Sequence, residues 1–250
     1  MGARGAEVLG EGSCWHMQND KGSRVAEKIK KWREKMTPAE LQKELTILLN
    51  NLLEDIGFSK KRIGVLRRKQ NECEQFFSCC FTRDRGLPGN MYSLGLTMSI
   101  SFVEVDKLTE LFSGKEYDAV WDTGAKPLYT VIPDQPVHRY KYCANEPLER
   151  LAKLISDDVH TYASSFYDNY DTLNKLEKYF DQHPDLVRTG EFRVVRENRY
   201  NNGCWCCKAA VLCVLKKWDK LQRYIDETDL LMPEQKERIR EFAASQQGAN

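Results

Sequence analysis

The chain has 250 residues, of which 41% are hydrophobic and 10% aromatic, a composition that fits a globular protein with a sizeable core. Lysine and arginine total 38 against 37 for aspartate and glutamate, so the formal net charge of +1 removes the global argument for nucleic-acid binding and leaves only local basic patches. No window approaches the roughly 18 consecutive apolar residues of a membrane-spanning helix, and the first residues lack the apolar run of a secretory signal. The nine cysteines are an odd number in a chain too long to need a disulfide scaffold. We therefore expect reduced thiols and a cytoplasmic protein.

Three regions are expected along the chain: a flexible tail at 1–22, an α+β domain at 23–185 and a helical C-terminal extension at 186–250. The tail is rich in glycine and polar residues and shows no period. The domain opens with an apolar stripe at helical spacing, surrounded by lysine and arginine. Such a helix either packs against the domain or binds a membrane surface or a partner groove. The stripe consists of Val25, Ile29, Trp32 and Met36.

A second helix has a clear start and stop. Thr37 can cap it, Pro38 suits its first turn, and Glu40 stands where a capping box requires it. Gly57 can supply the left-handed residue that ends such helices. The helical period between them is carried by Leu41, Leu45, Leu48, Leu49, Leu52, Leu53 and Ile56.

Residues 60 to 103 predict an antiparallel β-meander. Ile63 and Val65 alternate with polar residues, the stretch 72–82 is apolar in its second half, and a loop rich in glycine and proline follows it. The clearest strand is 91–102, where every second residue is large and apolar and those between are small or polar. Short connections favour antiparallel neighbours. The small residues at 93–101 form an open polar face unless helices cover it.

The sequence pattern after residue 103 predicts further strands and then helices. Trp121-Asp122 and Leu128–Ile132 are each expected to add a strand, limited by nearby prolines. Apolar stripes at helical spacing follow at 148–162, 173–180 and 207–225, and a short last helix begins at Pro233. A segregated sheet followed by helices is the α+β pattern: an antiparallel β-meander preceded by an amphipathic helix and followed by several C-terminal helices.

One family resemblance rests on short motifs between about 40 and 182. A leucine-rich helix leads into Asp55-Ile56-Gly57-Phe58-Ser59-Lys60-Lys61, followed by Arg67, the Phe76-Phe77 strand and Ser93-Leu94-Gly95-Leu96. This order resembles a domain-of-unknown-function family (number 4304), in which a tryptophan-containing strand and C-terminal helices come next. The resemblance implies a fold and no activity, and it assigns a role to no residue.

Asp157 and His160 are the candidates for catalysis. They are three residues apart on a predicted helix, so they share its polar face, and a carboxylate that orients an imidazole is a known acid–base arrangement. Exposed Asp–His pairs on helices are far commoner than active sites. The sequence contains no GxxxxGK[ST] phosphate loop, no GxGxxG after a strand, and no nucleophile flanked by an elbow-type glycine pattern. No cofactor is expected.

The cysteines near the C-terminus suggest a metal site only weakly. Cys204 and Cys207 are one helical turn apart and could share a metal ion, but no second close Cys or His pair accompanies them. Buried, unreactive thiols are the favoured interpretation.

A basic run gives the candidate binding residues Lys61, Arg62, Arg67 and Arg68. Two interpretations compete. Cations along a strand edge discourage edge-to-edge aggregation, and the same row with nearby aromatic rings could follow a phosphate backbone.

The sequence therefore favours a non-enzymatic interaction module that binds another protein, of the kind found among immunity proteins and antitoxins. The alternative is a hydrolase or nuclease that acts on nucleic acid through the basic strand, with Asp157 and His160 as its acid–base pair.

Overall fold

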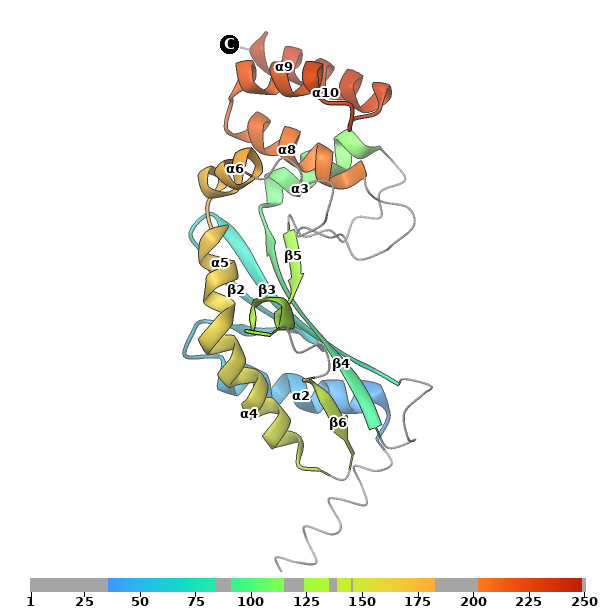
Figure 1. Cartoon of the computed structure of the whole chain (residues 1–250), viewed down its shortest axis with the longest axis vertical. Coiled ribbons are helices and arrows are strands. Elements are labelled where there is room, and N and C mark those ends of the chain that lie inside the picture. Colours follow the sequence, from blue (N-terminus) through green and yellow to red (C-terminus); the bar gives the residue numbers. More distant parts are fainter. Residues whose placement is uncertain are drawn as a thin grey trace, which may run out of the picture.

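The structure, a computed structural model, describes residues 36–83, 91–114, 124–134, 139–144, 146–182 and 202–248. The expected tail at 1–22, most of the helical stripe at 25–36, the strand at Trp121-Asp122 and the boundary near 186 lie outside these residues. Within them an antiparallel sheet is combined with helices that precede and follow it in the chain (Figure 1). The α+β prediction is confirmed.

Helix α2 (Pro38–Leu52) begins as its sequence predicts. The Thr37 hydroxyl accepts the Glu40 N–H, and the Glu40 carboxylate accepts the Thr37 N–H at 2.7 Å, so the capping box is confirmed. Gly57 has a φ of +85° in the turn that follows the helix, a backbone conformation that favours glycine.

The meander consists of four strands in chain order: β1 (Ser59–Arg62), β2 (Val65–Gln70), β3 (Cys73–Thr82) and β4 (Met91–Ser101). Each pairs antiparallel with the next, as predicted for residues 60–103. Two short strands, β5 (Gly124–Pro127) and β6 (Lys141–Cys143), pair with opposite ends of β4 and extend the sheet beyond it.

A long helical segment passes along one side of the sheet. It consists of α4 (Leu148–Asp158), a π-helical turn η2 (Val159–Ala163) and α5 (Ser164–Asn169), which follow one another without a break. Figure 1 shows α4 in front of the lower half of the sheet, near α2.

The remaining helices gather at the upper end of the molecule in Figure 1. The ion pairs of Glu177 with Lys217 and Lys220, the latter at 2.8 Å, join two segments of this group. Its members are α3 (Val103–Ser113), α6 (Leu173–Gln182), α8 (Asn202–Val214), α9 (Trp218–Glu227) and α10 (Pro233–Gln247).

Two predictions about secondary structure are wrong. The stretch expected as a strand at Leu128–Ile132 is a 3₁₀ helix, η1 (Leu128–Val131). Pro127 has already ended β5, and the Thr130 hydroxyl donates to the Pro127 carbonyl at 2.6 Å, which stabilises a tight turn in place of an extended chain.

The single stripe expected at 207–225 is divided between α8 and α9. Lys216 has a φ of +54°, and its N–H reaches the Cys213 carbonyl at 3.0 Å. The Lys217 N–H bonds to the Leu212 carbonyl at 2.9 Å, and the two bonds together form a Schellman motif. The motif is formed here without its usual glycine, so the sequence gives no stop signal.

The two faces of the sheet differ in what they contact. The Tyr92 hydroxyl donates to the Met36 carbonyl just before α2, and the Tyr167 hydroxyl of α5 donates to the Phe76 carbonyl at 2.7 Å. We call the side of these helices the covered face. Its strand residues are buried: Leu66, Phe77, Cys79, Phe81, Tyr92, Leu94, Leu96, Met98 and Ile100.

The alternate residues of the same strands point to the other side, which we call the open face. Because directly paired residues of an antiparallel sheet share a face, the strand register gives its members. They are Val65, Arg67 and Lys69 on β2; Glu74, Phe76, Ser78, Cys80 and Thr82 on β3; and Met91, Ser93, Gly95, Thr97, Ser99 and Ser101 on β4.

Candidate functional site

The centre of the open face is accessible among the described residues. Gly95 and Cys80, which are paired across β3 and β4, are both exposed. A Cβ built on Gly95 would have the Cys80 carbonyl oxygen as its nearest neighbour, at 3.9 Å, so there is room above this glycine. Ser78 and Thr97, the next pair along, are partly exposed. The described helices therefore leave this small, polar surface uncovered.

Cations lie toward both ends of this surface. Lys61, Arg62, Arg67 and Lys69 are exposed on β1 and β2 at one end. At the other end, Lys141 of β6 is exposed and is paired with Ser93, which places it on the same face. Lys141 was not among the binding residues predicted from the sequence. It lies between two aromatic residues, Tyr140 and Tyr142, which are both buried, and this alternation could have indicated a short strand with Lys141 on its exposed face.

Glu74 is the carboxylate that the strand register places among these cations, and it is already paired. Its carboxylate contacts the Arg67 guanidinium at 3.3 Å, and 47% of the Arg67 side chain remains exposed. Near the α3 end of the face, Asp106 accepts a hydrogen bond from Ser101. The described part of the face therefore has a local excess of positive charge in a chain whose net charge is +1.

Phe76 is the aromatic residue of the open face. Its ring is buried, at 6% exposure, and so is Ser99, its partner on β4, so the open face is buried at this pair. The Lys61 ammonium lies over this ring, 4.4 Å from its centroid, in a cation–π contact. The Lys61 side chain therefore lies on the open face, beside the Phe76–Ser99 pair.

Two backbone donors of the β1–β2 hairpin are bonded to side chains of α2. The Lys60 N–H of β1 donates to the Asn50 side-chain oxygen at 2.6 Å, and the Gly64 N–H in the turn after β1 donates to the Thr46 hydroxyl at 2.8 Å. A backbone donor that is already bonded cannot template a further strand. The bond to Asn50 therefore contributes to protection of the β1 edge alongside its cations.

Arg68 does not share the surface of the other three predicted binding residues. Its guanidinium lies between the rings of Phe58 and Tyr167, at 4.8 and 5.1 Å from their centroids. It donates to Gln75 at 2.6 Å and to the Ile56 carbonyl at 2.9 Å. Burial lowers the pKa of Arg68, and nearby Tyr167 and Asp168 oppose that shift. Arg68 thus joins the sheet to α5 on the covered face.

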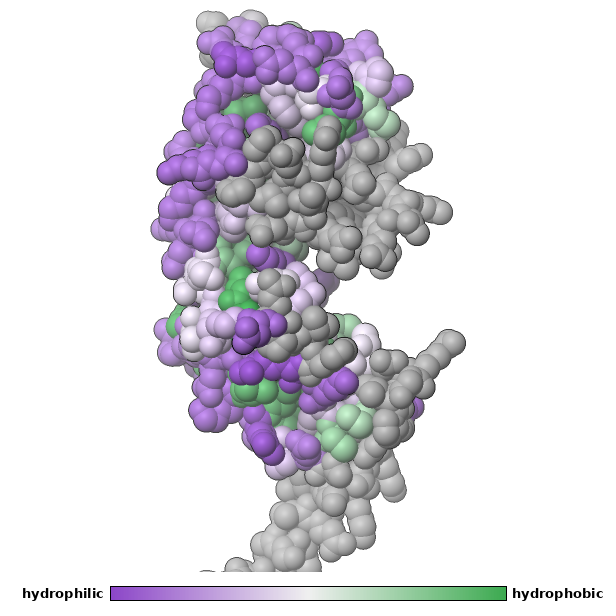
Figure 2. Space-filling model, in the orientation of Figure 1, coloured by the Kyte–Doolittle hydropathy of each residue, from purple (hydrophilic) through white to green (hydrophobic). Residues whose placement is uncertain are grey.

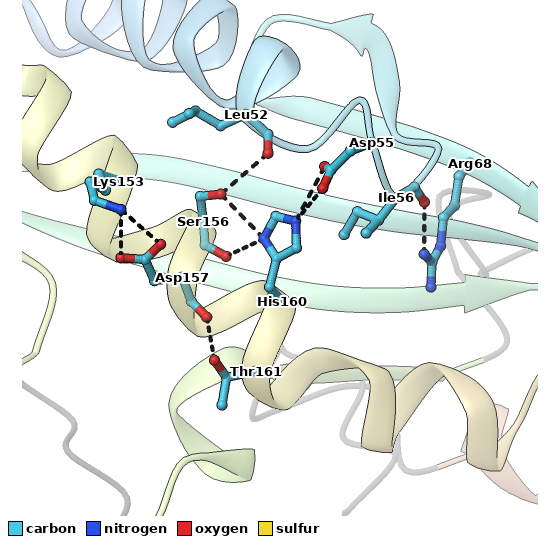
Figure 3. A network of polar contacts seen from close by, with 9 residues as sticks. All are labelled: Leu52, Asp55, Ile56, Arg68, Lys153, Ser156, Asp157, His160 and Thr161. Atoms are coloured by element: carbon cyan, nitrogen blue, oxygen red, sulfur yellow. Dashed lines mark hydrogen bonds and ion pairs between the residues drawn. The ribbon is translucent and has the colours of Figure 1, made fainter.

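The predicted catalytic residues are not paired with each other in the way expected. His160 lies in the π-helical turn η2, and its Nε2 contacts the Asp55 carboxylate at 3.0 Å (Figure 3). Asp157 instead contacts Lys153 at 3.2 Å. The pairing across 105 residues with Asp55 joins the long helix to the turn after α2.

The hydrogen bonds of the His160 ring favour its charged form. Nδ1 lies 2.7 Å from the Ser156 carbonyl oxygen, a pure acceptor, so this nitrogen carries a proton. Burial lowers the pKa of His160, but the bonds to Ser156 and Asp55 outweigh it and raise the pKa above its usual value. The hydrogen bond from His160 in turn lowers the pKa of Asp55.

A serine, a histidine and an aspartate therefore lie together, but their geometry is not that of a catalytic triad. A triad needs an imidazole nitrogen free to accept the serine proton. The Nδ1 proton of His160 points to the Ser156 carbonyl, while the buried Ser156 hydroxyl donates to the Leu52 carbonyl at 3.3 Å (Figure 3). The ring stabilises the π-helical turn, in which Thr161 also donates back to the Asp157 carbonyl at 2.7 Å.

No disulfide joins the cysteines that the structure describes. Within the described ranges, no group of three or more His, Cys, Asp or Glu residues is placed to hold a metal ion. Cys207 is buried in α8, while the side chain of its predicted partner Cys204 lies outside the described residues. Burial raises the pKa of Cys79 to about 12 and that of Cys73 to about 11, so both thiols are protonated at neutral pH.

Comparisons with known proteins give no relative: no protein-family model, no curated protein and no solved structure matches this chain. The resemblance to family 4304 stays a prediction. Among the described helices, none is both long and apolar enough to cross a membrane.

Proposed function

We propose that this chain is a non-enzymatic binding module that holds a partner macromolecule on the open face of its sheet, in the reducing environment of the cytoplasm. The observation that carries the proposal is the uncovered centre of that face around Gly95, with exposed cations toward both ends. An antiparallel sheet can be packed with helices on one face and exposed on the other, and a binding site built on strands is held more precisely than one built on loops.

Two other parts of the described molecule are weaker candidates for the binding site than the open face. In the view of Figure 2, the outer surface of α9 and α10 is predominantly hydrophilic. The His160 cluster serves the π-helical turn, so it gives no support to the hydrolase or nuclease alternative.

Photo-crosslinking tests the proposal without knowledge of the partner. A photoreactive amino acid at Cys80, on the open face, is compared with one at Ala244, which is exposed on α10. We expect a discrete crosslinked species from position 80 alone. Its loss in a Gly95→Gln background is expected as well, because the added side chain fills the space above β4. Equal crosslinking from both positions, or no effect of Gly95→Gln, contradicts the proposal.

A further inference from the structure

The charges on the open face indicate the chemistry of its partner. Its register-placed and neighbouring cations are Lys61, Arg62, Arg67, Lys69 and Lys141, against the carboxylates of Glu74, which is paired with Arg67, and of Asp106 at the α3 end, which accepts a hydrogen bond from Ser101. From the Arg67–Phe76 pair to the Thr82–Ser93–Lys141 row, β3 advances six residues, a distance of about 20 Å at ~3.3 Å per residue. A complementary partner must therefore carry negative charge repeatedly along an extended path.

Between the cations the side chains are short. Ser78 and Thr97 are partly exposed, Cys80 and Gly95 are exposed, and Gly95 leaves its position open. A folded protein partner relies on large side chains that enter pockets. An extended strand of nucleotides needs only a flat surface for its bases and cations for its phosphates.

Phe76 lies at the Arg67 end of this surface and does not offer its ring to a base. The ring is 6% exposed, and Ser99, which is paired with it on β4, is 1% exposed, so this end of the open face is buried. The exposed Lys61 ammonium, 4.4 Å from the ring centroid, can contact a phosphate there.

We infer that the open face binds single-stranded nucleic acid, with its phosphates on the cations at the two ends and its bases over the Ser78–Thr97 and Cys80–Gly95 pairs. The inference rests on the proposed function and names the partner class of the same face. It concerns non-specific or weakly specific binding, because the central residues offer few groups that distinguish one base from another.

Fluorescence anisotropy with labelled single-stranded polyuridine RNA and polythymidine DNA tests it on the full chain. Contacts to four or five phosphates predict that the logarithm of the association constant falls with the logarithm of salt concentration with a slope of about −3. Each of Lys69→Gln and Lys141→Gln should flatten the slope by about 0.7 and weaken binding about fivefold at 0.1 M salt. Lys153→Gln is the matched control, because it removes one charge from an exposed lysine of α4 on the other side of the sheet.

A second pair of variants separates charge from bulk. Gly95→Glu and Gly95→Lys add similar volume to the same open position with opposite charge. We expect Gly95→Glu to abolish binding and Gly95→Lys to retain it.

Several results would overturn the inference. They are absent binding of both polymers, a Lys153→Gln effect equal to that of Lys69→Gln, tighter binding of a duplex of the same length, or equal competition by polyglutamate of matched charge. Polyglutamate competition would identify an acidic protein as the partner class. In each of these cases, crosslinking from position 80 that Gly95→Gln abolishes would leave the proposed function intact, so the two failures are distinguishable.

Discussion

The cluster of Arg139, Tyr140 and Asp158 should be a main stabilising contact between the long helix and the segment that leads into β6. The Asp158 carboxylate is buried and accepts three hydrogen bonds, two from Arg139 at 2.6 and 2.8 Å and one from the Tyr140 hydroxyl at 2.8 Å. Burial, together with the Asp158 charge, raises the pKa of Tyr140, so its hydroxyl keeps its proton and donates. The Tyr140 carbonyl accepts the Leu94 N–H at 3.0 Å, which connects the cluster to β4.

The magnitude follows from what each substitution leaves behind. Tyr140→Phe removes one buried hydrogen bond to a charged acceptor, worth about 1.5–3 kcal/mol, and leaves Asp158 bonded to Arg139. Asp158→Ala leaves the Tyr140 hydroxyl buried without an acceptor, at about 1–3 kcal/mol. It also removes an ion pair worth at most about 1 kcal/mol, because 35% of the Arg139 side chain is exposed and screened by water.

Urea unfolding followed by circular dichroism measures these free energies. The double variant should be less destabilised than the sum of the single variants, because both remove the same bond. A Tyr140→Phe variant within about 0.5 kcal/mol of the wild type, or strict additivity, would refute this account of the cluster.

Three further results are expected. Because the pKa of His160 is raised in the fold, the stabilisation from its charged form is fully present below pH 6.5, its usual value, and disappears as pH rises through the folded-state pKa. Urea titrations should therefore show a deficit for His160→Gln at about pH 5.5 that shrinks by about pH 9, and a deficit independent of pH would contradict this. A thiol reagent should modify the exposed Cys80 of the native protein well before its buried neighbour Cys79, and peptide mapping that finds equal rates would contradict the strand register. Gly64→Ala should destabilise by about 1–3 kcal/mol or more in urea unfolding, because φ is +77° and the new Cβ would lie 2.8 Å from the Cys79 carbonyl oxygen; a loss under about 0.5 kcal/mol would contradict it.

Local signals in the sequence predicted local structure well. Thr37, Pro38 and Glu40 define the start of α2 because a capping box is made by residues three apart. The alternation at 91–102 predicted β4 because one face of this strand is buried throughout, while the other is partly or fully exposed except at Ser99.

Features that depend on contacts between distant segments of the chain could not be predicted from the sequence. His160 bonds to Asp55, 105 residues earlier, and nothing near either residue indicates the partner. The end of α8 depends on Lys216 in a left-handed conformation. Glycine usually occupies such a position, so the lysine did not indicate that the helix ends there.

The placement of Arg68 could have been predicted. Leu66 is buried on the covered face, and a period of two puts Arg68 beside it, away from Arg67 and Lys69. A run of like charges on a strand therefore divides between two faces, and only alternate members belong to one binding surface.

Nuclear magnetic resonance of the full chain, titrated with single-stranded polyuridine RNA, locates RNA binding on the molecule, because each backbone amide reports its own surroundings. We expect the largest chemical-shift changes on the open face, at Ser78, Gly95 and Thr97 and at the backbone of Lys69 and Lys141, with α9 and α10 unchanged. Shifts concentrated on α9 and α10, or no shifts at saturating RNA, would contradict this expectation.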